Sequence, residues 1–115
     1  MERSKHLLPA DEALVRAVYS DGVPVSRLAA LGDARAGPAA ARALRRRLRR
    51  LLARMLSERF VGVLRRQDEW GVTRRRVAAA CVLQGLTMRE AAAALGVSYH
   101  TVRRHMEAVG AICGE

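Results

Sequence analysis

The stretch LTMREAAAALGVSYHTVRRHME, residues 86–107, decides the fold of this chain. Thr87 and Glu90 have the spacing of a capping box, in which each side chain accepts a hydrogen bond from the other residue's backbone N–H. They predict a helix over 88–95. Gly96 follows directly, and glycine readily adopts the left-handed backbone that a tight turn needs. The stretch therefore begins with a short helix that stops abruptly.

A second helix follows this turn. Ser98 is placed to cap it, and the helix is predicted to run to about residue 109. Val97 and Val102 face inward, and Ala92 is small enough to let two helices cross closely. Because these requirements are met together at one spacing, the sequence predicts a helix-turn-helix.

A similar set of residues occurs 63 positions earlier in the chain. At this shift Gly22 falls on Gly85 and Ala29 falls on Ala92. The hydrophobic residues that coincide are Leu14 with Val77, Val15 with Ala78, Val18 with Cys81, and Tyr19 with Val82. The alternative is that any two amphipathic helices joined by glycine look alike. We favour two copies of one three-helix unit, because the glycine and the alanine both coincide.

In the first copy, a helix is predicted from the acidic residues Asp11 and Glu12 to a stop at Asp21-Gly22. A short segment over 24–31 and a loop over 32–38 follow, and Pro38 suits the first turn of the next helix. That helix is long, with an apolar stripe formed by Leu44, Leu48, Leu51, Leu52 and Met55. Its other faces carry Arg42, Arg45, Arg46, Arg47, Arg49, Arg50 and Arg54.

The two copies are connected by a helix and a short linker. Ser57 can cap a helix that runs through Arg66, and 67–73 reads as a linker with Trp70 packed against one unit. A helix over 74–84 then opens the second copy. The predicted fold is all-α, with two tandem three-helix helix-turn-helix units joined by a basic helix and a short linker. We expect the first unit over 1–66 and the second over 67–115.

The charge of the chain is concentrated in its middle. The 115 residues carry a net charge of +10, and the isoelectric point is about 11.4. Residues 35–66 hold eleven arginines and one acidic residue, Glu58. A compositional bias explains arginine in place of lysine, but it does not explain the excess of basic over acidic residues. A basic stripe of this kind is typical of nucleic-acid binders.

The motif residues resemble two families of transcription proteins. Leu86–Ala92, Leu95–Ser98 and Thr101–Met106 are similar to the helix-turn-helix of LuxR-type regulators and to region 4 of sigma-70 family sigma factors. In the first copy, 8–22 resembles the opening of region 4, and 43–52 resembles its recognition helix. The resemblance implies double-stranded DNA as the partner, together with contact to RNA polymerase. Nothing here resembles the region with which a full sigma factor grips core polymerase.

The expected DNA-contacting residues lie on the outer faces of two helices. Arginine reads guanine with two hydrogen bonds, whereas a dense arginine set suits phosphate contact. In the second copy, the residues expected to face the major groove are Ser98, Tyr99, His100, Arg103, Arg104 and Glu107. In the first copy, the outer face consists of Arg42, Arg45, Arg46 and Arg49. The alternative for both sets is a solvated face. The arginines of the first copy could instead face an acidic protein partner, and Tyr99 could cover the hydrophobic edge of the turn.

Other classes of site find no support in the sequence. Paired carboxylates, a nucleophile elbow and a phosphate loop are missing, so we expect no enzyme. His100 and His105 are five residues apart and do not share a helix face, so we expect no metal and no cofactor. Cys81 reads as a small buried hydrophobe rather than a disulfide partner of Cys113. Without a signal peptide or an apolar run of about 20 residues, the expected location is cytoplasmic, with no membrane partner.

The function predicted from these patterns is sequence-preferring binding of double-stranded DNA in transcription, in the manner of a sigma factor or a regulator. Two alternatives remain open. One is a protein-interaction module that binds RNA polymerase or a partner regulator. The other is the DNA-binding part of a recombinase or transposase. The sequence does not fix the oligomeric state.

Overall fold

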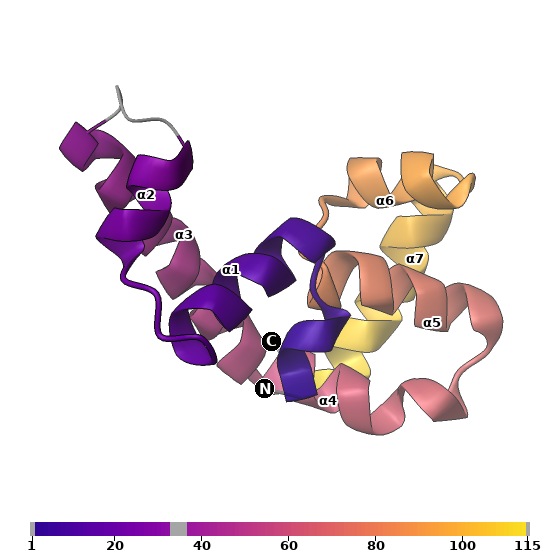
Figure 1. The fold of residues 1–115 in the computed structure, drawn as a ribbon. Helices are drawn as coiled ribbons and strands as arrows, with labels where there is room; N and C mark the ends of the chain where they lie inside the picture. The colour runs from indigo at the N-terminus through magenta and orange to yellow at the C-terminus, as the bar shows by residue number, and fades with distance from the viewer. Residues whose placement is uncertain (1, 33–36, 115) are drawn as a thin grey trace. The chain divides into compact units, whose positions relative to one another are not determined.

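A computed structural model describes residues 2–32 and 37–114, and in these ranges the chain is all-helical (Figure 1). The chain forms two packing units, Met1–Ala53 and Arg54–Glu115. The all-α prediction is confirmed. The loop expected over 32–38 falls largely on 33–36, which lie outside the described residues.

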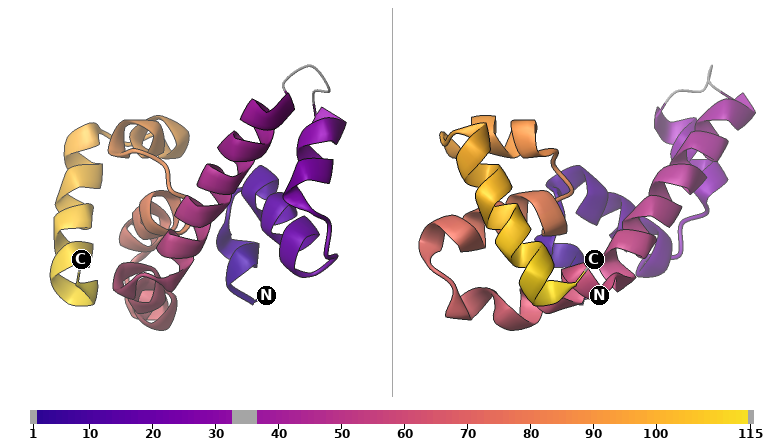
Figure 2. Two further views of the ribbon diagram at one scale, coloured as in Figure 1. Left: turned by 90° about the vertical axis from the view of Figure 1, so that its left-hand side faces the viewer. Right: turned by 180° about the vertical axis from the view of Figure 1, so that it is seen from behind.

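The first unit contains the 3-10 helix η1 (Glu2–His6), the helices α1 (Pro9–Tyr19) and α2 (Val25–Gly32), and most of α3 (Gly37–Leu56). α2 lies beside the N-terminal half of α3 (Figures 1 and 2). Pro9 and Pro38 stand in the first turns of α1 and α3, where a missing N–H costs no hydrogen bond. The buried core of this unit consists of Leu7, Leu14, Val15, Ala29, Ala41, Leu48 and Leu51.

The second unit contains α4 (Glu58–Arg66), the 3-10 helix η2 (Gln67–Glu69), α5 (Val72–Ala78), the π-helical segment η3 (Ala79–Leu83), α6 (Met88–Leu95) and α7 (Tyr99–Cys113). One core cluster joins the last three-helix set and is formed by Val77, Ala80, Ala91, Ala92 and Val102. The helix expected over 74–84 begins at Val72 and ends in the π-helical turn η3. This turn also buries Ala80 and Leu83, which the sequence pattern did not assign to the core.

α4 packs with the second unit rather than the first, where we had placed it. Its buried residues Phe60 and Val63 belong to the second unit, and α4 contacts α7 and η3. α7 runs to Cys113 instead of about residue 109, and its added turn extends the helix beside α4. The predicted cap is confirmed, because the Ser57 side chain accepts a hydrogen bond from the backbone N–H of Phe60 at 3.2 Å.

The second helices of the two copies, α2 and α6, have corresponding boundaries. The bounds of α2 and α6 differ by 63 residues at both ends, and Gly22 and Gly85 both take positive φ, at 69° and 76°. The chain turns in the same way after each first helix. The N–H of Val23 donates to Ala17 O at 2.9 Å, and the N–H of Leu86 donates to Ala80 O at 3.0 Å. The backbone hydrogen bonds at these two turns thus follow the same 63-residue repeat as the sequence.

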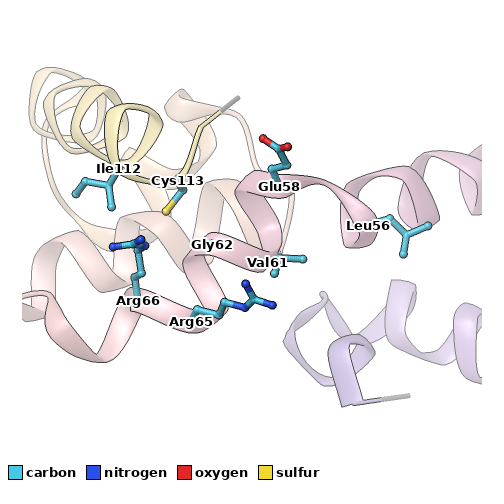
Figure 3. Close-up of a pocket in the computed structure, with 8 residues that line it drawn as sticks. All are labelled: Leu56, Glu58, Val61, Gly62, Arg65, Arg66, Ile112 and Cys113. Carbon is cyan, nitrogen blue, oxygen red and sulfur yellow. The ribbon is translucent and has the colours of Figure 1, made fainter.

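α4 and α7 are in close contact at Gly62. Figure 3 shows Gly62 beside Cys113, at the end of α7. A Cβ atom on Gly62 would lie 2.7 Å from Cys113 Cβ and 3.2 Å from its Cα. Because the obstacle includes backbone, this contact cannot relax by a side-chain rotation alone. On the facing helix, a Cβ on Gly110 would meet only the far end of the Arg59 side chain, at 3.1 Å.

We expect Gly62→Ala to melt at a lower temperature than Gly110→Ala. Overpacking costs about 1–3 kcal/mol, which exceeds or offsets the gain of about 1 kcal/mol from replacing a glycine inside a helix. Gly110→Ala is the matched control, since it brings the same helical gain and meets only the end of the Arg59 side chain, whose Nε donates to Gly114 O at 3.0 Å, and no backbone. Thermal denaturation of both variants checks the expectation. Equal melting temperatures would contradict the close approach of α4 to α7.

Candidate nucleic-acid interface

The helix-turn-helix of the second unit is fixed by caps at both of its helices. Thr87 Oγ1 accepts from the N–H of Glu90 at 3.1 Å, and Glu90 Oε1 accepts from the N–H of Thr87 at 2.9 Å. The hydrogen bond from the Thr87 backbone N–H, followed by one from the Thr87 side chain, lowers the pKa of the Glu90 carboxyl. Gly96 ends α6 with a φ of 67°, and the Ser98 side chain accepts from the N–H of Thr101 at 3.1 Å. The predicted capping box, turn and second cap are all present.

The outer face of α7 carries most of the predicted reading residues. His100, Arg103, Arg104 and Glu107 are exposed, and Tyr99 is 40% exposed. Val102, on the opposite, inner face of α7, is fully buried. The first turn of α7 contains no acidic residue, so the backbone N–H groups at the positive end of the helix dipole face no carboxylate of that turn. This arrangement disfavours an isolated helix but suits the binding of a polyanion.

Ser98 differs from the other predicted residues because its hydroxyl is already engaged. It caps α7 through Thr101 N–H, and its Oγ lies 2.9 Å from Thr101 Oγ1 in a second hydrogen bond. The side chain lies at the exposed start of the helix. Its hydrogen bonds within the protein hold the N-terminus of α7 in place.

The structure adds Arg89 to this surface. Its guanidinium carbon lies 5.2 Å from the centre of the Tyr99 ring, at cation–π distance. Both side chains are exposed, and they join the start of α6 to the start of α7. The pattern of the second helix alone does not predict Arg89. An arginine in the first turn of the first helix, with a tyrosine opening the second, is the signal that could have found it.

Arg103 and Glu107 form an ion pair on the outer face of α7. Arg103 Nε lies 3.3 Å from Glu107 Oε1, and the two side chains are 62% and 66% exposed. A solvent-exposed pair four residues apart contributes only about 0.3–0.5 kcal/mol. Here the arginine precedes the glutamate, which is the less favourable order on a helix. Either side chain can therefore exchange this weak ion pair for a stronger hydrogen-bonding partner.

The arginine face of α3, in the first unit, consists of Arg42, Arg45, Arg46 and Arg49, as the sequence indicated, and all four are exposed. Arg50 is also exposed. From Arg42 to Arg50 the helix rises about 12 Å, close to the span of several phosphates along one strand. Two of the arginines assigned to the polar faces differ. Arg47 Nη2 pairs with Asp11 Oδ1 at 2.6 Å, and Arg54 is half-buried.

Neither a metal nor a disulfide is built into the described part of the chain. Within residues 2–32 and 37–114, no group of three His, Cys, Asp or Glu residues could hold a metal ion. Cys81 and Cys113 are free and half-buried. Burial raises the pKa of the Cys81 thiol and that of the Cys113 thiol. None of the described helices is long and apolar enough to cross a membrane.

His105, on the flank of α7, is held by α5. Arg74 Nε donates a hydrogen bond to His105 Nδ1 at 3.3 Å. Burial lowers the pKa of His105, and the positive charges of Arg74 and Arg104 lower it further. Its neutral form is therefore the form that joins α5 to α7.

We expect acid to destabilise the second unit through this contact. The folded pKa of His105 is lowered below the ordinary value of 6.5, so its stabilising effect is present above that pH and is lost as the pH falls towards the folded pKa. His105→Gln keeps an acceptor for Arg74 and should flatten the fall in melting temperature below about pH 6.5. His100→Gln, which removes a histidine outside this contact, is the control. An unchanged pH profile in His105→Gln would contradict this role.

Residues 69–109 match the model of a family described as a homeodomain-like domain. The match begins at the end of η2 and covers α5, η3, α6 and α7 as far as Val109, while α4 and the first unit lie outside it. No curated protein and no solved structure matches the chain. The second unit is thus similar to a DNA-binding helix-turn-helix, in agreement with the geometry of α6 and α7.

Proposed function

We propose that this chain binds double-stranded DNA with a sequence preference, by placing α7 in the major groove. The observation that carries the proposal is the exposed, basic outer face of α7, held beyond the tight Gly96 turn in a segment similar to a homeodomain-like domain. In helix-turn-helix proteins the second helix is the one that contacts base edges.

The side chains divide into two kinds of contact. His100, Arg103, Arg104 and Glu107 lie along one exposed face, from which they can reach base edges. Ser98, Tyr99 and Arg89 lie at the helix starts, where backbone N–H groups and a cation suit the flanking phosphates. The arginine face of α3, in the first unit, suits contact with DNA phosphates. Its density of charge supports affinity rather than selection among bases.

The biological setting that we propose is transcription, with the chain acting in the manner of a sigma factor or a regulator and with RNA polymerase as a further partner. The motif residues and the tandem units support this setting. A protein-interaction module and the DNA-binding part of a recombinase or transposase are the competing assignments.

Selection of bound sequences from a pool of random duplexes tests the proposal. The full chain should enrich a defined motif, because each mismatched base pair in a site typically costs about 1–3 kcal/mol of binding free energy. Binding that enriches no motif would overturn sequence preference. Absence of duplex binding, combined with binding to purified RNA polymerase, would instead support the interaction module.

A pair of arginine variants separates reading from anchoring. On the selected site, Arg104→Ala should cost about 1–3 kcal/mol, with little effect on a scrambled duplex. Arg46→Ala should weaken binding to both duplexes alike and lower the slope of log K against log salt by about one. Arg65→Ala, an exposed arginine of α4, is the control for charge alone. Affinities for both duplexes across a salt titration give the answer.

The opposite pattern is equally informative. If Arg46→Ala abolished the sequence preference while Arg104→Ala left it intact, then α3 would be the reading helix and the two roles would be exchanged.

A further inference from the structure

We propose that Glu107 is a specificity-determining residue, which makes strong binding conditional on a cytosine close to the guanine that Arg103 reads. The inference rests on the proposed function and concerns the selectivity of the same site. It starts from the ion pair between Arg103 Nε and Glu107 Oε1 on the exposed face of α7. Glu107 is the only acidic residue in this helix.

A carboxylate on a surface that faces DNA is unfavourable unless it finds a hydrogen-bond donor. Every phosphate repels it, whatever the base sequence. The base that offers a suitable donor in the major groove is cytosine, whose N4 amino group donates to Glu or Asp. Arg103, one turn earlier, can donate two hydrogen bonds to O6 and N7 of guanine. Together the two side chains match a site that contains both bases.

The spacing of the pair fits neighbouring positions on the duplex. Four residues of α-helix rise about 6 Å, and base pairs follow one another at about 3.4 Å along a strand. The two side chains therefore reach bases that are one or two steps apart. Since both side chains are more than half exposed, neither must leave a buried position to do so.

The same pair weakens binding where the sequence is wrong. On a mismatched duplex, Arg103 keeps Glu107 as its partner and neutralises no phosphate, and no base offers Glu107 a donor. The order of the two residues is the less favourable one for helix stability, so stability alone does not account for a glutamate at this position. Only a site that offers both bases replaces the ion pair, because guanine then accepts from Arg103 and cytosine donates to Glu107.

Removing the charge of Glu107 tests this inference. In Glu107→Gln and Glu107→Ala, Arg103 is released to contact phosphate on any duplex. Affinity for a scrambled duplex should rise, and the slope of log K against log salt should steepen by about 0.9. The ratio of selected-site to scrambled affinity should fall by roughly 5- to 150-fold. Selection from random duplexes should lose one cytosine position.

Two further variants control the experiment. Asp68→Asn changes the net charge by the same amount at an exposed residue of η2, and it should leave the affinity ratio and the slope unchanged. Arg103→Gln in the Glu107→Gln background should return the scrambled-duplex affinity and the slope to those of the parent, because the released arginine is then gone. Thermal denaturation shows that each variant is folded before binding is measured.

The possible outcomes separate this inference from the proposed function. If the parent chain enriches a motif and Glu107→Gln enriches the same motif with the same ratio, the role of Glu107 is overturned and the proposed function stands. If Asp68→Asn raises non-specific binding equally, net charge is the cause and the inference also falls. If the parent enriches no motif, both the proposed function and the inference fall.

Discussion

The crossing of α6 and α7 at the Gly96 turn is the constraint on which the candidate interface depends. Gly96 takes the left-handed conformation that would strain other residues, and Ala91, Ala92 and Val102 then close the space between the helices. This packing determines which face of α7 is left exposed. Because Val102 is fully buried, Arg103 and Arg104 must point outward. The exposed basic face is thus a direct result of apolar packing beneath it.

Local chemistry made much of this fold predictable from sequence. The caps at Thr87 and Ser98 and the turn at Gly96 depend on residues within four positions, so their spacing alone specifies them. The 63-residue repeat was also visible, because glycine and alanine are required at the same steps of both copies. Among the interface residues, the exposed face of α7 follows from helical periodicity once Val102 is taken as buried.

Contacts between distant segments could not be predicted in this way. The pairing of Arg47 with Asp11 joins residues 36 positions apart, and the stacking of Arg89 on Tyr99 joins two helices across a turn. α4 was predicted to belong to the first unit, because its amphipathic pattern indicates that one face is buried but does not indicate which helix covers that face. The π-helical turn of η3 was missed for a related reason, since no local residue signal specifies it and burial on several sides accompanies it.

The position of α4 bears on how this protein can be divided into fragments. The segment that resembles a homeodomain-like domain begins at residue 69, yet Phe60 and Val63 of α4 are completely buried in the same unit and α4 lies against α7. A fragment cut at the limits of the family match would leave the C-terminal half of α7 without that cover. The family match and the packing unit therefore have different limits in this chain. An expression fragment of the second unit should begin upstream of Ser57, the cap of α4.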